Sequence, residues 1–322
     1  MEYRELGRTG WKVSEIGLGT WAMGSSWGAV DDSQSLATLN RALDLGVNFF
    51  DTADVYGSEP LLGQLRRQRS EPFYIATKLG VRLNPDPRAY NRKNMTASVE
   101  GSLRDLGVET IDLMQLHVPP PEAYNAEVFG ILDELVEAGK IRHYGVSVER
   151  IAEAEKALEF PGIQSVQIIF NIFRQRPAES FFPKAKSRGV GILARVPLAS
   201  GLLTGKMTRA TTFSADDHRS YNREGEAFDK GETFAGVDYE TGLRTVEELR
   251  PLVPAGATMA QLALRWILMH DGITATIPGA KTPEQARSNA AAADLPPLPA
   301  ATMERIAELY ATRVKPLVHQ RW

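Results

Sequence analysis

The segment Gly46-Val47-Asn48-Phe49-Phe50-Asp51-Thr52-Ala53-Asp54-Val55-Tyr56-Gly57 contains the unit from which most of the chain is built. Before it, residues 32–45 repeat apolar side chains at helical spacing and end at Gly46, which predicts a helix. Within it, Asn48-Phe49-Phe50-Asp51 is a short apolar run of the kind that forms a buried strand. A helix that leads into a buried strand indicates parallel strands joined by crossover helices.

The same alternation recurs along the chain after a predicted N-terminal hairpin formed by residues 3–6 and 12–13. We expect helices at 97–106, 129–138 and 180–188, among others, and strands at 15–18, 48–51, 73–77, 111–116, 142–146, 165–169, 191–194 and 275–277. Eight strand–helix units favour an α/β fold of the (β/α)8 TIM-barrel type, with residues 1–322 as a single domain. An open doubly wound sheet is the alternative. Its usual mark is a Gly-x-Gly-x-x-Gly turn, and here Gly17-Leu18-Gly19 is followed by no third glycine, so we interpret these glycines as a tight turn.

A long polar, glycine-rich segment at 200–236 interrupts the alternation after the seventh strand. Loops of this length in compact domains are usually functional or disordered. At the carboxyl end of the barrel this loop would either fold over a ligand or be a mobile surface excursion, and the sequence leaves both open.

Composition excludes several classes of protein. The chain has no cysteine, which rules out a disulfide scaffold, a thiolate nucleophile and a Cys-ligated metal. A net charge of −3 gives no electrostatic case for a nucleic acid or an anionic membrane as partner. The N-terminus shows no signal-peptide pattern, and no apolar run approaches the ~20 residues of a membrane span. We therefore expect a cytoplasmic protein; its oligomeric state stays open.

Polar side chains follow three successive predicted strands, at the barrel end where active sites of this fold collect. Asp51 ends the second strand and Tyr56 lies in the loop after it, Lys78 ends the third strand, and His117 ends the fourth. Singly, each has an ordinary structural explanation: a cap, a turn aromatic, a solvated lysine, a structural histidine. Their joint occurrence favours a catalytic group.

This set of side chains suits the reduction of a carbonyl by a nicotinamide, which needs a hydride on carbon and a proton on oxygen. A tyrosine with a pKa near 10 is a slow acid, and a neighbouring ammonium such as Lys78 would lower that pKa. Asp51 would hold Lys78 charged, and His117 would donate a hydrogen bond to the substrate oxygen.

The segment 46–57 resembles the signature of the aldo-keto reductases. So do Ile75-Ala76-Thr77-Lys78, Ile111-Asp112-Leu113-Met114-Gln115-Leu116-His117 and Gly201-Leu202-Leu203-Thr204-Gly205-Lys206. The resemblance covers nearly the whole chain. It implies a barrel that binds a nicotinamide dinucleotide in extended form without a Rossmann domain, with Tyr56 as the acid/base assisted by Asp51, Lys78 and His117.

The resemblance also implies a set of cofactor-binding residues. Ser147 and Gln167 would hold the nicotinamide carboxamide, and Leu198 and Gly201 would lie along the pyrophosphate. Gly279 and Lys281 would lead into a helix whose N-terminus favours a phosphate. Gln285 and Asn289 would meet the adenine side.

Two positions depart from the common pattern. Where many relatives place an aromatic ring against the nicotinamide, this chain has Arg195, whose planar guanidinium can stack or contact a phosphate. An arginine that relatives committed to NADP often carry near Gln285 is missing, and Lys281 or Arg287 would bind the 2′-phosphate instead. We expect NADP(H), with NAD(H) as the alternative.

Trp21, Met23 and Trp27 follow the first strand and either line an apolar substrate pocket or pack locally. The predicted function is reduction of small aldehydes, ketones or sugar carbonyls. A nucleotide-sensing subunit with slow turnover, like the β subunits of potassium channels, is the alternative. A metal-dependent hydrolase using Asp51, Asp54, Glu59 and His117 is poorly supported, because the chain has five histidines and none is spaced as a paired metal ligand. No metal is expected.

Overall fold

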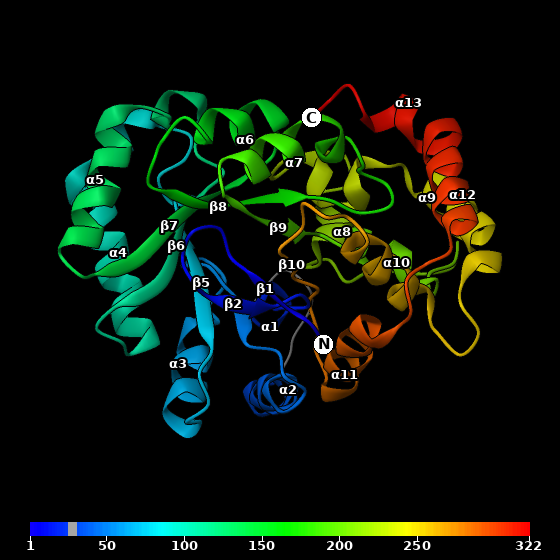
Figure 1. Cartoon of the computed structure of the whole chain (residues 1–322), viewed down its shortest axis with the longest axis horizontal. Coiled ribbons are helices and arrows are strands. Elements are labelled where there is room, and N and C mark those ends of the chain that lie inside the picture. The colour runs from blue at the N-terminus through cyan, green and yellow to red at the C-terminus, as the bar shows by residue number, and fades with distance from the viewer. Residues whose placement is uncertain (25–30) are drawn as a thin grey trace.

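A computed structural model describes residues 1–24 and 31–322, and within them eight parallel strands form one sheet surrounded by helices (Figure 1). The strand order β10-β9-β8-β7-β6-β5-β4-β3 follows the chain, so each strand pairs with its sequence neighbour. The strands are β3 (Leu18–Gly19), β4 (Phe49–Asp51), β5 (Tyr74–Leu79), β6 (Ile111–His117), β7 (Ile141–Val148), β8 (Ile163–Ile169), β9 (Gly191–Arg195) and β10 (Ala275–Thr276). All eight predicted strands are present, with ends shifted by a few residues.

The two edges of this sheet meet through parallel bridges between Ile16 and Thr276 and between Gly19 and Gly279. The backbone N–H of Gly17 donates to Thr276 O at 2.8 Å, which continues the contact. The sheet is therefore a nearly closed barrel, and the (β/α)8 prediction is confirmed. Because β3 is held to β10 only by these bridges, the regular part of the first strand is shorter than the predicted 15–18.

The predicted hairpin is present as β1 (Tyr3–Glu5) and β2 (Lys12–Ser14), paired antiparallel. Leu6 and Val13 from this hairpin are fully buried and pack against inward side chains of the strands, among them Phe49, Leu113 and Leu193. The hairpin therefore closes the amino end of the barrel, opposite the end where β4, β5 and β6 deliver their polar residues.

Helices cover the outside of the barrel, and α12 near the C-terminus lies at one side against α9 (Figure 1). The helix bounds are α1 (Trp21–Gly24), α2 (Asp32–Asp44), α3 (Glu59–Gln68), α4 (Arg92–Leu106), α5 (Ala126–Glu137), α6 (Ile151–Ala157), α7 (Pro177–Ser187), α8 (His218–Tyr221), α9 (Tyr239–Leu249), α10 (Met259–Leu268), α11 (Pro283–Ala290), α12 (Ala300–Leu309) and α13 (Lys315–Val318). Side-chain caps from Asn91 and Asn125 open α4 and α5, which begin several residues before the predicted 97 and 129.

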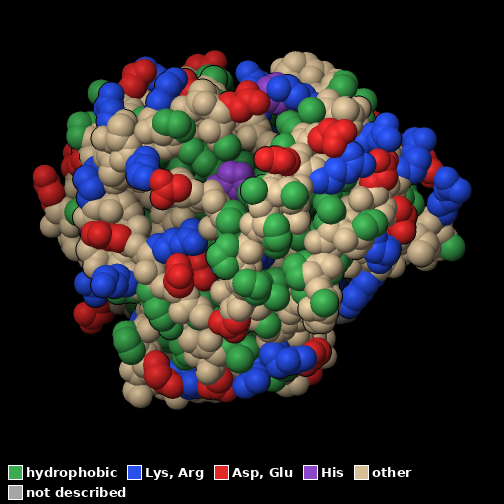
Figure 2. Space-filling view, turned by 45° about the vertical axis from the view of Figure 1, so that its right-hand side comes forward, with side chains coloured by type: hydrophobic (Ala, Val, Ile, Leu, Met, Phe, Trp, Pro, Cys, Tyr) green, Lys and Arg blue, Asp and Glu red, His purple; other side chains and the backbone are tan. Residues whose placement is uncertain are grey.

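The long loop after β9 contains regular secondary structure. It contains the short 3-10 helices η3 (Ala199–Thr204), η4 (Lys230–Glu232) and η5 (Phe234–Gly236) as well as α8. Within the described residues, none of the helices combines the length and the apolar character that crossing a membrane requires. Acidic and basic side chains are interspersed over the face shown in Figure 2, in keeping with the small net charge.

Candidate active site

Asp51 and Lys78 meet inside the mouth of the barrel because β4 and β5 pair in parallel with Asp51 opposite Ala76. The register places Lys78 just beyond this pair with its side chain directed inward. Lys78 Nζ donates to Asp51 Oδ1 at 2.5 Å and to Thr52 O at 2.6 Å, and the lysine is fully buried. A buried ammonium with two oxygen acceptors is a compensated charge.

Tyr56 joins this pair through a tight turn in which its N–H donates to Ala53 O at 3.0 Å. Its ring centroid lies 4.9 Å from Lys78 Nζ. The ring of His117, from the end of β6, lies edge-on to that of Tyr56 with 5.8 Å between centroids. The structure thus brings together all four side chains of the predicted catalytic group.

Two glutamines donate hydrogen bonds to Oδ2 of Asp51. The sequence analysis assigned one of them, Gln167, to the nicotinamide carboxamide and gave no role to the other, Gln115. Gln167 Nε2 donates to Asp51 Oδ2 at 2.8 Å and Gln115 Nε2 does so at 3.3 Å. Both amides are buried. Gln115 was overlooked as a site residue, although a lone amide between Met114 and Leu116 in an apolar strand was a usable signal.

Burial decides the protonation of the catalytic group. Burial lowers the pKa of Lys78, while the facing carboxylate of Asp51 raises it. The pKa of His117 falls well below its usual range because burial disfavours the imidazolium, with Lys78 and Arg195 adding to the effect. His117 is therefore neutral near pH 7 and can serve as a hydrogen-bond donor rather than as a cation.

The expectation that the pKa of Tyr56 is lowered overall is not met in this arrangement. Burial raises the pKa of Tyr56 well above 10, the carboxylates of Asp51 and Glu232 raise it further, and Arg195 lowers it. Lys78 Nζ is paired with Asp51 Oδ1 at 2.5 Å, and the carboxylate of Asp51 itself raises the pKa of the phenol. The phenol consequently holds its proton at neutral pH.

Asp54, between the end of β4 and Tyr56, is a partly buried carboxyl whose surroundings disfavour its ionised form. Its Oδ1 is buried and finds no hydrogen-bond partner in the described part of the chain. Burial raises the pKa of Asp54 to about 6, against the opposing charges of Arg82 and Lys78.

The candidate nicotinamide residues lie at the ends of the next three strands. Ser147 and Gln167 are opposite each other in β7 and β8, with Ser147 Oγ 3.4 Å from Gln167 Oε1. Arg195 ends β9 and is buried, and its Nε has no hydrogen-bond partner among the described residues; the same holds for His117 Nδ1. Unsatisfied buried polar atoms around a catalytic group fit a site that binds a polar ligand.

The backbone after β9 is strained where the pyrophosphate is expected. Val196, Ala199 and Ser200 adopt positive φ angles of 52°, 46° and 53°, which cost of order 1–3 kcal/mol each and cluster at functional sites. Gly201 at φ 98° follows them and Leu198 precedes the turn, its O accepting the N–H of Gly201 at 2.9 Å.

The remaining predicted cofactor residues gather at the start of α11. Asn289 Nδ2 donates to Gly279 O at 3.1 Å, and the backbone N–H of Lys281 donates to Gln285 Oε1 at 2.7 Å. Burial lowers the pKa of Lys281, as does Arg219 of the long loop, while Asp217 of that loop raises it. The loop after β9 therefore comes close to this helix end.

Of the predicted substrate residues, Trp21 lies at the mouth. Its ring is roughly parallel to that of Tyr56 with 6.0 Å between centroids, and it lies 4.9 Å from His218 and 6.1 Å from Phe228 of the long loop. Met23 is buried in the core. Trp27 falls outside the described residues. His218 and Phe228 had no recognisable signal, because only the folded loop brings them to the mouth.

No group of three or more His, Asp or Glu side chains within the described ranges is arranged to hold a metal ion. Glu59, one of the carboxylates considered as a metal ligand, instead accepts a hydrogen bond from Thr77 Oγ1 at 2.6 Å.

Comparison with known proteins agrees with this geometry. The model of the Aldo/keto reductase family matches residues 15–311. The chain belongs to this family. This aldo/keto reductase is 35% identical over 295 residues to aldo-keto reductase YhdN of Bacillus subtilis, which covers 88% of the chain and 86% of that relative. It is 28% identical over 319 residues to a probable voltage-gated potassium channel subunit beta of Oryza sativa, covering 92% and 93% of the two chains.

Solved structures of relatives share the barrel. The glycerol dehydrogenase AKR11B4 from Gluconobacter oxydans aligns with a TM-score of 0.81 at 30% identity, over 97% of this aldo/keto reductase and 96% of that chain. The holo form of aldo-keto reductase AKR11C1 from Bacillus halodurans aligns with a TM-score of 0.76 at 27% identity, with 96% of each chain covered. These relatives support an oxidoreductase.

Proposed function

We propose that this aldo/keto reductase uses NADP(H) to reduce aldehydes or ketones, sugar carbonyls among them, with Tyr56 as the proton donor. NAD(H) is the alternative cofactor. We propose further that residues 1–322 act as a single domain in the cytoplasm on a small-molecule substrate. The observation that carries the proposal is the convergence of Tyr56, Lys78, Asp51 and His117 in one barrel mouth.

Each member of this group has a distinct role. Tyr56 keeps its proton at neutral pH and can pass it to a carbonyl oxygen as negative charge develops there. The ammonium of Lys78, oriented by Asp51, stabilises the phenolate left behind. Neutral His117 donates a hydrogen bond to the same oxygen. The reduced nicotinamide, when bound, supplies the hydride.

The residues around the mouth fit such a cofactor. Ser147, Gln167 and Arg195 would meet the nicotinamide end, where buried polar atoms such as Arg195 Nε lack partners among the residues that the structure describes. Leu198 and Gly201 would accompany the pyrophosphate, and Gly279, Lys281, Gln285 and Asn289 the adenosine half. Trp21, with Met23 and Trp27 as further candidates, would contact the substrate.

The proposal is tested by following absorbance at the nicotinamide band with NADPH and then NADH, against a panel of aldehydes, ketones and sugars. We expect oxidation that depends on both the cofactor and the carbonyl, faster with NADPH. Lys281→Ala should raise the KM for NADPH about tenfold and that for NADH by less than about twofold, because only NADPH carries the 2′-phosphate. Equal effects on both would show that Lys281 does not read this phosphate.

Similarity to potassium channel β subunits favours one second candidate, a nucleotide-sensing subunit with slow turnover. Tight NADPH binding with no turnover on any carbonyl of the panel would support this second function instead.

A further inference from the structure

A buried group of charged side chains adjoins the catalytic residues at the end of β9. Arg195 Nη2 donates to Val148 O at 2.8 Å and lies 3.3 Å from Glu149 Oε2, while Nη1 pairs with Glu232. The three side chains are only 9%, 15% and 15% exposed. Arg195 is thus held by three groups from the end of β7 and the long loop, and is not a freely moving surface arginine.

Glu232 reaches this position only because the loop folds back. Ser200 Oγ donates to Glu232 O at 2.8 Å and accepts the N–H of Phe234 at 3.0 Å, which fixes η4 and η5 against the strained turn after β9. The carboxylate that completes the cluster is therefore supplied by the folded loop.

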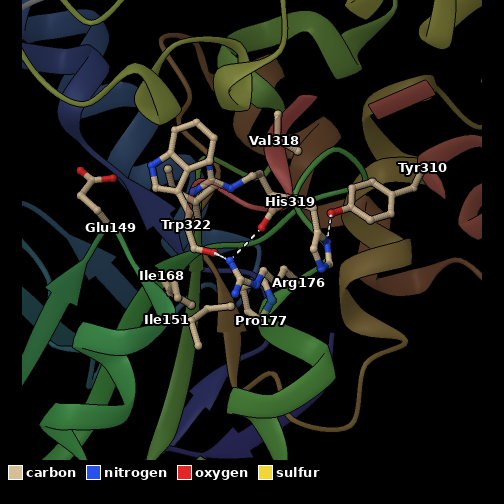
Figure 3. A pocket seen from close by; sticks show the side chains of 11 residues that line it. Glu149, Ile151, Ile168, Arg176, Pro177, Tyr310, Val318, His319 and Trp322 are labelled. Carbon is tan, nitrogen blue, oxygen red and sulfur yellow. Dashed lines mark hydrogen bonds between the residues drawn. The ribbon is translucent and has the colours of Figure 1, made fainter. Parts of the chain in front are cut away.

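The C-terminal Trp322 braces the same part of the loop from the other side. Its Nε1 donates to Asp229 Oδ1 at 2.9 Å, and the Arg174 guanidinium lies 3.7 Å from its ring centroid. A Cβ on Gly236 would come within 2.5 Å of the indole, so the loop backbone rests directly on it. Trp322 and Glu149 line a common small cavity, where Arg176 holds the Trp322 carbonyl oxygen (Figure 3).

The charges of this cluster reach the catalytic group. Arg195 lowers the pKa of Tyr56, of Lys78 and of His117, whereas Glu232 raises that of Tyr56 and Lys78, in each case secondary to burial. Burial also raises the pKa of Glu149 well above its usual range, with the like charge of Glu232 adding to it. Of the two carboxylates, Glu232 makes the closer contact with the guanidinium of Arg195, so it is the one better placed to balance that charge.

We propose that Glu232 is a charge-balancing and positioning residue of the active site, which fixes Arg195 beside the catalytic group and offsets its charge where the nicotinamide ring binds. This inference rests on the proposed function. A hydride donor must lie beside the proton donor Tyr56, and hence within reach of Arg195. The oxidised nicotinamide carries a positive charge and the reduced ring does not, so an unbalanced guanidinium would penalise the oxidised cofactor selectively.

The test compares the dissociation constants of NADP+ and NADPH, measured by fluorescence titration. Glu232→Gln should raise the ratio Kd(NADP+)/Kd(NADPH) about fivefold or more, because Arg195 loses its counter-charge. Arg195→Gln should lower the ratio below that of the unaltered protein. Effects of opposite sign cannot come from general damage to the fold, and Glu232→Asp, which keeps the charge, should restore the ratio to within about twofold.

Glu224→Gln is the matched control, since Glu224 is an exposed carboxylate of the same loop that pairs with Lys230. A second readout is the alkaline limb of the pH profile for reduction. This limb reports the ionisation of the Tyr56 phenol. The charged and titratable groups around that phenol are Asp51, Asp54, Lys78, His117, Arg195 and Glu232. Glu232→Gln should move this limb to lower pH.

The inference is overturned if Glu232→Gln and the control Glu224→Gln have the same ratio Kd(NADP+)/Kd(NADPH) and the same alkaline limb in the pH profile. If the unaltered protein binds neither NADP(H) nor NAD(H), the proposed function itself fails. The two failures are therefore distinguishable.

Discussion

Lys78 keeps a charge in a fully buried position, which depends on the oxygens that surround it. Asp51 Oδ1 and Thr52 O accept from its ammonium at 2.5 and 2.6 Å. Asp51→Asn removes the counter-charge and should cost about 3–5 kcal/mol of unfolding free energy, because a buried charge is left uncompensated. Urea unfolding at pH 7 measures it. A loss below about 1 kcal/mol would mean that Lys78 gives up its proton without penalty.

Asp54 provides a pH-dependent prediction at the same scale. Its pKa in the folded protein is about 6, above the ordinary 3.8, so folding favours the protonated carboxyl. The stabilisation is fully present below about pH 3.8 and is lost as the pH rises through 6. Asp54→Asn should therefore raise Tm more at pH 8 than at pH 4.5. The same Tm difference at both pH values would contradict the account.

The sequence was sufficient to predict that the four side chains of the proposed catalytic group lie together, because each follows a recognisable strand in a parallel barrel. The pKa shifts of these side chains could not be predicted from the sequence. The raised pKa of Tyr56 depends on burial and on Glu232, a residue distant in sequence that only the folded loop supplies. Glu149 was missed for the same reason, because its partner Arg195 lies on a distant strand. Gln115 was overlooked although its lone amide in an apolar strand was a usable signal.

At the scale of elements, the N-terminal hairpin closes the end of the barrel opposite the catalytic group. Leu6→Ala would leave a cavity in the fully buried cluster with Phe49 and Leu113, at a cost of about 2–5 kcal/mol. The Kd for NADPH should stay unchanged, because the site is at the other end. Leu317→Ala, at a side chain 37% exposed, is the control and should change stability by less than about 0.5 kcal/mol. Weakened NADPH binding in Leu6→Ala would show that the two ends are coupled.

Element identity was predictable from periodicity, and element ends were less so. The first strand shortened because its partner β10 is itself brief and meets it only through bridges. The loop at 200–236 could be located by its polar composition. Its short helices could not be anticipated, since they are held by distant partners such as Arg195 and Trp322.

At the scale of the whole molecule, the loop after β9 connects the barrel mouth with the start of α11 and the C-terminus. Phe228 and His218 lie against Trp21, and Arg219 acts on Lys281. Bound NADPH should add contacts to this loop and stabilise its folded conformation. Tryptic cleavage after the exposed Arg209 and Arg223 should therefore slow at least about threefold. Digestion followed by mass spectrometry measures it. Cleavage at an unchanged rate with saturating NADPH would show that the loop does not respond to the cofactor.

The central claim is that Tyr56 delivers the proton in a nicotinamide-dependent reduction. The most direct measurement is single-turnover oxidation of enzyme-bound NADPH by an aldehyde, in the unaltered protein and in Tyr56→Phe. We expect the rate to fall by about 10²–10⁴-fold in the variant, with the Kd for NADPH within about twofold, because the ring remains and only the acidic proton is lost. A Tyr56→Phe protein that oxidises NADPH at the original rate would contradict the account.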